Sequence, residues 1–88
     1  MTGVEIAQRA REQLAFLTGL EPDTLSGLAR HDDGWHVNVD FVELKRIPNA
    51  TDVLATYEAV LDDKGNLLRH QRLRRFLRAQ VTDGREQV

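Results

Sequence analysis

The sequence predicts an α+β fold in which one N-terminal helix packs on a four-stranded antiparallel sheet, in the order α-β-β-β-β. Apolar residues recur at helical spacing near the N-terminus and alternate with polar residues in the segments that follow. Turn motifs separate these alternating segments from one another. With 88 residues, 41% hydrophobic and 30% charged, the chain has the size and composition of one folded domain. We expect this domain to span residues 1–81, followed by a flexible tail over residues 82–88.

The helix is predicted over residues 3–18. Thr2 and Glu5 have the spacing of a capping box, in which each side chain bonds the backbone of the other residue. Gly19 suits a left-handed cap at the far end, and Pro22 prevents the helix from resuming. Four apolar residues form the stripe that we expect to face the sheet: Ile6, Ala10, Leu14 and Leu17.

Two strands are predicted next, joined by a tight turn at residues 32–34. A short strand over residues 25–30 contains Gly27, which indicates a bulge or a close approach of another backbone. Residues 35–41 alternate between apolar and polar and are the clearest strand in the chain. After Phe41 the alternation slips, which predicts either a bulge or partial cover on both faces.

The last two strands follow a break at Pro48, which cannot donate a hydrogen bond to a central ladder. Residues 53–61 alternate again, and residues 62–66 form a polar hairpin loop. The pattern over residues 67–77 fits either a helix or a strand. The preceding hairpin and the need to complete the sheet favour a strand.

Several classes of functional site have no support in the sequence. The absence of cysteine excludes disulfides, thiolate metal sites and a cysteine nucleophile. Ser26, the sole serine, has no nucleophile-elbow context, and no phosphate-binding glycine motif is present. His31 and His36 flank two acidic residues, but turn geometry alone explains acids and glycine at that place. We therefore expect no enzyme activity, no cofactor and no metal.

No apolar stretch approaches the roughly 18 residues that a membrane span needs. The first twenty residues carry four charged side chains, which argues against a secretory signal. A cytoplasmic location with no membrane association is the expectation.

The charges are strongly segregated along the chain, although the net charge is only −2. Residues 67–78 hold five arginines and no acid, whereas residues 1–66 hold six basic and twelve acidic residues. The arginines are Arg69, Arg72, Arg74, Arg75 and Arg78. Glu58 and Asp52 on the neighbouring strand would neutralise them internally in one interpretation. In the other, the arginines bind an acidic partner, because a guanidinium pairs with a carboxylate through two parallel hydrogen bonds.

The predicted partner-binding surface combines these arginines with Pro48, Asn49 and Asp52 in the adjoining loop. Glu43 bears on the same question: if it lies on the buried face, an arginine from the final strand is its expected partner. The acidic net charge argues against nucleic acid as the partner. Since Trp35 is needed for the core, the chain also has no evident platform for stacking bases.

Five segments are similar to a known family. They are Asp33-Gly34-Trp35, Val42 to Pro48, Thr51 to Glu58, Leu61 to Leu67, and Arg72 to Phe76. Together they resemble the gas vesicle protein O family (GvpO). The resemblance implies a cytoplasmic accessory protein, associated with gas vesicles, that binds other gas vesicle proteins rather than catalysing a reaction. A homodimer formed through an exposed strand stays open, as does a small regulatory or peptide-binding domain of the helix-on-sheet type.

Overall fold

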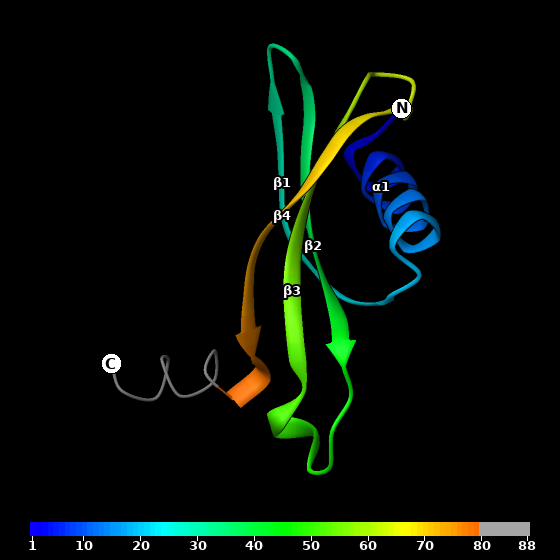
Figure 1. Cartoon of the computed structure of the whole chain (residues 1–88). Coiled ribbons are helices and arrows are strands. Elements are labelled where there is room, and N and C mark those ends of the chain that lie inside the picture. Colours follow the sequence, from blue (N-terminus) through cyan, green and yellow to red (C-terminus); the bar gives the residue numbers. More distant parts are fainter. Residues whose placement is uncertain (80–88) are drawn as a thin grey trace, which may run out of the picture.

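The structure, a computed structural model, describes residues 1–79, which form one α-helix, a short 3₁₀ helix and one four-stranded sheet (Figure 1). The elements are α1 (Gly3–Thr18), β1 (Glu21–His31), β2 (Gly34–Leu44), the short 3₁₀ helix η1 (Asn49–Thr51), β3 (Val53–Leu61) and β4 (Leu67–Leu77). The strands lie in the order β1-β2-β3-β4, and each neighbouring pair is antiparallel. The predicted α-β-β-β-β fold is confirmed. The predicted tail over residues 82–88 lies outside the described residues.

Both ends of α1 are where the sequence places them. The Thr2 hydroxyl accepts a hydrogen bond from the Glu5 amide at 3.2 Å, and the Glu5 carboxylate accepts one from the Thr2 amide at 3.1 Å. Gly19 has a φ of 71°, in the left-handed region, and its amide donates to the carbonyl of Ala15 at 2.9 Å. The capping box and the glycine cap therefore define the predicted helix.

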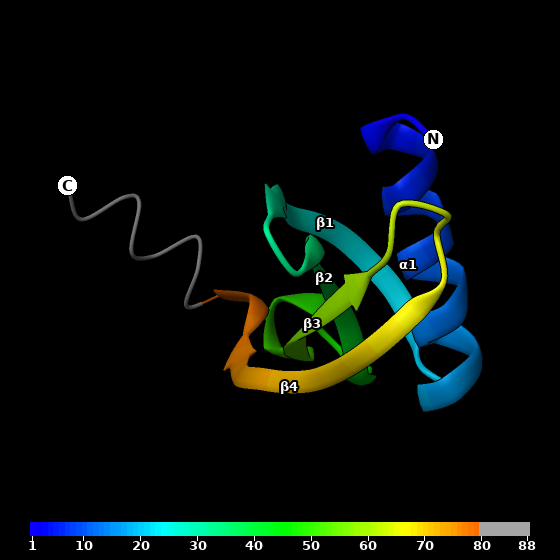
Figure 2. The same cartoon turned by 90° about the horizontal axis from the view of Figure 1, so that it is seen from above.

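The core lies between α1 and one face of the sheet, which Figure 2 shows from above. The Phe41 and Tyr57 rings meet edge to face there, with centroids 5.6 Å apart. The fully or almost fully buried members of this core are Ile6, Ala7, Ala10, Leu14, Val37, Val39, Phe41, Ala59 and Leu61. Trp35 is partly buried and packs against them. We call this side of the sheet the helix side and the other side the open face.

Register shifts explain where the alternation of the sequence failed. One lies at Leu25/Gly27 in β1 and one at Val42/Leu44 in β2, which confirms the predicted irregularities. β4 contains two more, because the pairing passes over Leu68 and Leu73. Each skipped residue reverses the facing of those that follow, so the pattern of β4 did not read as a simple strand.

β1 is longer than predicted, because it begins at Glu21 and not at Leu25. Pro22 lies within it, paired with Phe41 of β2. An edge strand tolerates proline where the missing N–H would face away from the ladder. Pro22 therefore follows the end of the helix, as predicted, and also lies within the edge strand.

Candidate partner-binding surface

The arginines of β4 surround one edge of the sheet. Because of the two register shifts, Arg72 and Arg75 lie on the helix side, while Arg69 and Arg74 lie on the open face. All four are exposed. We call these four residues the basic edge, since they follow the edge of the sheet instead of lining one face.

Glu43 holds the two arginines on the helix side. Its Oε1 atom lies 2.7 Å from Nε of Arg75, and its Oε2 atom lies 3.2 Å from Nη1 of Arg72. The Tyr57 hydroxyl donates to Oε2 at 3.4 Å. The Glu43 side chain is only 14% exposed, so the predicted need for an arginine partner is confirmed. One carboxylate shared by two guanidinium groups leaves one positive charge in surplus.

Arg69 joins a polar network on the open face. Its Nη2 atom donates to Asp33 at 2.6 Å, and Nε2 of His36 lies 2.8 Å from the other carboxylate oxygen of Asp33. These contacts, the Arg69 bond above all, hold the pKa of Asp33 well below its usual range. Asp33 in turn raises the pKa of His36. Glu58, predicted to neutralise an arginine, binds His36 and Gln71 instead.

Arg74 contacts no carboxylate within residues 1–79. Its Nε atom is 3.5 Å from the Thr56 hydroxyl, and its guanidinium carbon lies 4.8 Å from the centre of the Phe76 ring. Thr56 donates its own hydrogen to Asp40 at 2.6 Å. Among the described residues, the positive charge of Arg74 therefore has no carboxylate to neutralise it, and stacking on Phe76 holds the guanidinium in place.

Arg78 ties the end of β4 to the rest of the sheet. Its Nη2 atom lies 3.1 Å from Oδ1 of Asp23 in β1 and 3.3 Å from Oδ2 of Asp52. Asp52 is buried and also accepts from the Arg46 amide at 2.7 Å. The side chains of Arg78 and Asp52 thus hold the loop and the sheet together. No sequence signal marked Asp23 for this role.

Pro48 and Asn49 are exposed in the loop between β2 and β3. The Ile47–Pro48 peptide bond is cis. The carbonyl of Asp52 accepts from the Arg78 amide at 3.0 Å, which places this loop beside the C-terminal end of β4 (Figure 1). The structure therefore brings the predicted loop next to the basic edge.

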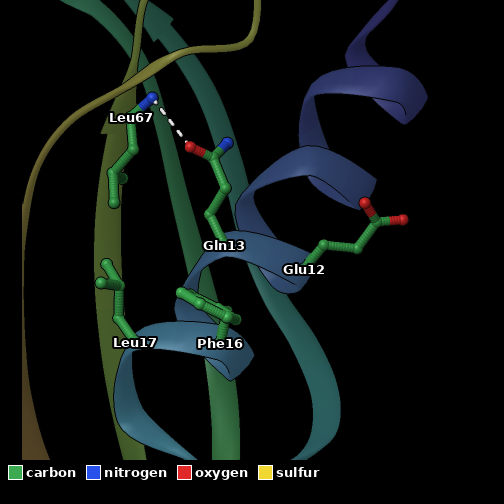
Figure 3. Close-up of a pocket in the computed structure, with 5 residues that line it drawn as sticks. All are labelled: Glu12, Gln13, Phe16, Leu17 and Leu67. Carbon is green, nitrogen blue, oxygen red and sulfur yellow. Dashed lines mark hydrogen bonds between the residues drawn. The ribbon is translucent and has the colours of Figure 1, made fainter.

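The hollows among the described residues differ in their lining: one on the open face is lined by Glu58, Arg69 and His70, whereas another, beside α1, is largely apolar. A groove of about 280 Å³ between α1 and β4 has a single ionisable lining residue, Glu12. Gln13 closes its upper end by accepting from the Leu67 amide at 3.2 Å, with Phe16 and Leu17 below it (Figure 3). Within residues 1–79, no three His, Cys, Asp or Glu side chains gather as a metal site would require. No helix in that range is long and apolar enough to cross a membrane.

The fold and its surface define a small helix-on-sheet domain with a basic edge strand. The chain belongs to the gas vesicle synthesis protein GvpO family, which matches it over residues 1–82. This confirms the resemblance seen in the sequence.

Three similar proteins are named gas vesicle protein O or O1. Gas vesicle protein O of Streptomyces sp. (strain CB03234) is 41% identical over 75 residues, which cover 85% of this chain and 59% of that protein. Gas vesicle protein O of Haloferax mediterranei is 31% identical over 83 residues, covering 92% and 59%. Gas vesicle protein O1 of Halobacterium salinarum is 28% identical over 75 residues, covering 85% and 63%. The chain thus spans about three fifths of the length of these relatives. No solved structure matches it.

Proposed function

We propose that the chain acts in gas vesicle formation as a non-enzymatic accessory factor that binds other gas vesicle proteins through the basic edge. Membership of the gas vesicle synthesis family supports the process. On this proposal the protein works in the cytoplasm, in association with gas vesicles. The adjoining Pro48, Asn49 and Asp52 loop extends the binding surface.

The observation that carries the mechanism is the excess of guanidinium groups over carboxylates at β4. Glu43 serves both Arg72 and Arg75, and Arg74 has no carboxylate within residues 1–79. Two positive charges therefore remain at an exposed edge. Arginine offers a planar fork of donors that matches a carboxylate, so an acidic protein surface is the partner that this edge fits best.

The edge also exposes backbone groups to which a partner strand can pair. The register shifts at Leu68 and Leu73 interrupt that row, which favours recognition by the arginine side chains. A homodimer through the same edge would bring two positively charged surfaces together, and this repulsion opposes it.

Co-purification from cells that form gas vesicles tests the proposal. A variant carrying Arg72→Glu, Arg74→Glu and Arg75→Glu is expected to recover at most about a tenth of the gas vesicle proteins that the unaltered chain recovers, since several charge contacts are reversed. Arg74→Glu alone breaks no ion pair within residues 1–79, so it tests the edge with little risk to folding.

The matched control carries Arg9→Glu, Arg30→Glu and Lys64→Glu, which change the net charge equally but lie outside the basic edge. This control should recover its partners normally. Unchanged recovery by a folded triple variant contradicts the proposed surface. If the unaltered chain captured RNA or DNA, and this binding fell steeply with added salt, the basic edge would be assigned to nucleic-acid binding instead of to a protein partner.

A further inference from the structure

The β1 edge of the sheet is apolar on the helix side and only half covered. Leu28 pairs with Val37 of β2, and Leu25 pairs with Val39. The two valines are 0% and 1% exposed, but the two leucines are 41% and 48% exposed. The apolar layer beneath α1 therefore extends onto β1, where no other element fully covers the leucine side chains.

The β4 edge is built differently. Following the paired residues across the sheet from β1 to β4, the row that starts at Leu28 ends at His70. The row that starts at Leu25 ends at Arg72. Polar residues suit an edge that faces water, whereas half-exposed leucines at the equivalent positions of the other edge do not. β4 has half-exposed leucines as well, at 53% for Leu68 and 46% for Leu73, but both lie at its register shifts. Leu25 and Leu28 differ because they pair with buried core residues of β2, so at β1 the apolar layer of the core itself reaches the surface.

A groove of about 200 Å³ lies between α1 and this edge. Its lining residues are Val4, Ala7, Gln8, Arg11, Leu25, Leu28 and Val39. Arg11 is the only ionisable member, and no carboxylate within residues 1–79 pairs with it. The groove thus combines an apolar floor with one unneutralised cation at its rim.

The dimensions of the groove match a short length of helix. The α1 wall from Val4 to Arg11 measures about 10 Å at 1.5 Å per residue, and the β1 wall from Leu25 to Leu28 measures about 10 Å at 3.3 Å per residue. Two turns of an α-helix, with apolar side chains at i, i+3 or i+4, and i+7, span the same length. An added strand fits less well, because β1 has register shifts at Pro22/Thr24 and Leu25/Gly27.

We propose that the groove between α1 and β1 binds an amphipathic α-helix of a protein partner, with an acidic residue of that helix facing Arg11. A second copy of this chain would bring two Arg11 side chains into one interface with no lining carboxylate to neutralise them. The surface is separate from the basic edge, and the proposal does not depend on the role in gas vesicle formation.

A synthetic 18-residue peptide provides the test. It carries leucine at i, i+3, i+4 and i+7 with glutamate flanking the stripe, and its binding to the full chain is measured by fluorescence anisotropy. Leu28→Ser is expected to weaken binding about tenfold, as the loss of an apolar anchor does. Arg11→Glu should weaken the binding of this peptide and strengthen the binding of a version in which lysine replaces glutamate.

Two variants are matched controls. Arg9→Glu makes the same charge change on the same helix outside the groove, and Phe16→Ser removes an exposed apolar side chain from the groove on the other side of α1. Both should bind the peptide within about twofold of the unaltered chain, because neither residue lines the groove. Circular dichroism confirms that each variant is folded.

Three results would overturn the inference: no binding at about 1 mM peptide, equal binding of a scrambled peptide, or binding unchanged by Leu28→Ser. Sedimentation velocity supplies a fourth, since a dimer lost on Leu28→Ser would assign the groove to a second copy of the chain. None of these outcomes depends on whether gas vesicle proteins co-purify through the basic edge.

Discussion

Glu43→Gln separates the structural role of the basic edge from its binding role, because the two roles predict opposite changes. Glutamine keeps the size of the side chain and can still accept from the Tyr57 hydroxyl, but it loses the charge that pairs with Arg72 and Arg75. Those arginines are 48% and 57% exposed, so each pair contributes only about 0.2–1 kcal/mol. The free energy of unfolding should fall by about 0.5–2 kcal/mol.

Binding should change in the other direction. Without the carboxylate, the surplus at the basic edge rises from two positive charges to three. Association with an acidic partner should therefore become faster, and co-purification of gas vesicle proteins should increase about twofold or more. A protein that is less stable and yet binds better is the expected result.

Urea unfolding monitored by Trp35 fluorescence gives the stability, and quantitative mass spectrometry of co-purified proteins gives the binding. The difference in free energy of unfolding between the unaltered chain and Glu43→Gln should shrink in 1 M NaCl, because the screening length there is about 3 Å. Glu12→Gln, which removes the same charge from α1, should leave binding unchanged. If Glu43→Gln lowers stability but leaves binding at the level of this control, Arg72 and Arg75 only neutralise Glu43, and the reasoning is refuted.

Three further changes test the fold. The pKa of His36 is raised in the folded protein, so protonation of His36 stabilises the fold. This stabilisation is complete below about pH 6.5 and is lost as the pH rises through the folded pKa. In urea unfolding, His36→Gln should therefore reduce the gain in stability that the unaltered chain shows between pH 8 and pH 6. Gly34→Ala should lower the free energy of unfolding by about 2 kcal/mol or more, because at φ 135° the added methyl group meets the Leu61 carbonyl. Gly19→Ala, where the methyl group would face open space, should lower it less in the same thermal unfolding assay. Leu14→Ala, at a fully buried position, should cost about 2–5 kcal/mol in the same assay, and a smaller loss would mean that α1 packs loosely.

Local signals were sufficient to predict α1 and most of the sheet. Thr2, Glu5 and Gly19 have short-range capping roles that depend only on their immediate neighbours, so their spacing determines the ends of the helix. The alternation of residues 35–41 likewise follows from having one face on the core. β1 was underestimated because Pro22 is compatible with an edge strand, and the position of a strand within the sheet is a tertiary property.

β4 shows why the site was only partly predictable. The register shifts at Leu68 and Leu73 decide which arginines share a face, and they depend on pairing with β3. Glu43 was predictable, because a carboxylate in a run of buried residues needs a partner. Asp23 was not, since its contact with Arg78 spans 55 positions along the chain.

Complementation of cells whose own copy has been deleted tests the central claim most directly. The measurement is the pressure-sensitive turbidity that intact gas vesicles give to a cell suspension. The unaltered chain should restore this signal, whereas the folded variant with Arg72, Arg74 and Arg75 changed to glutamate should not, at equal expression. Full restoration by that variant would contradict the claim that the basic edge carries the function of the protein.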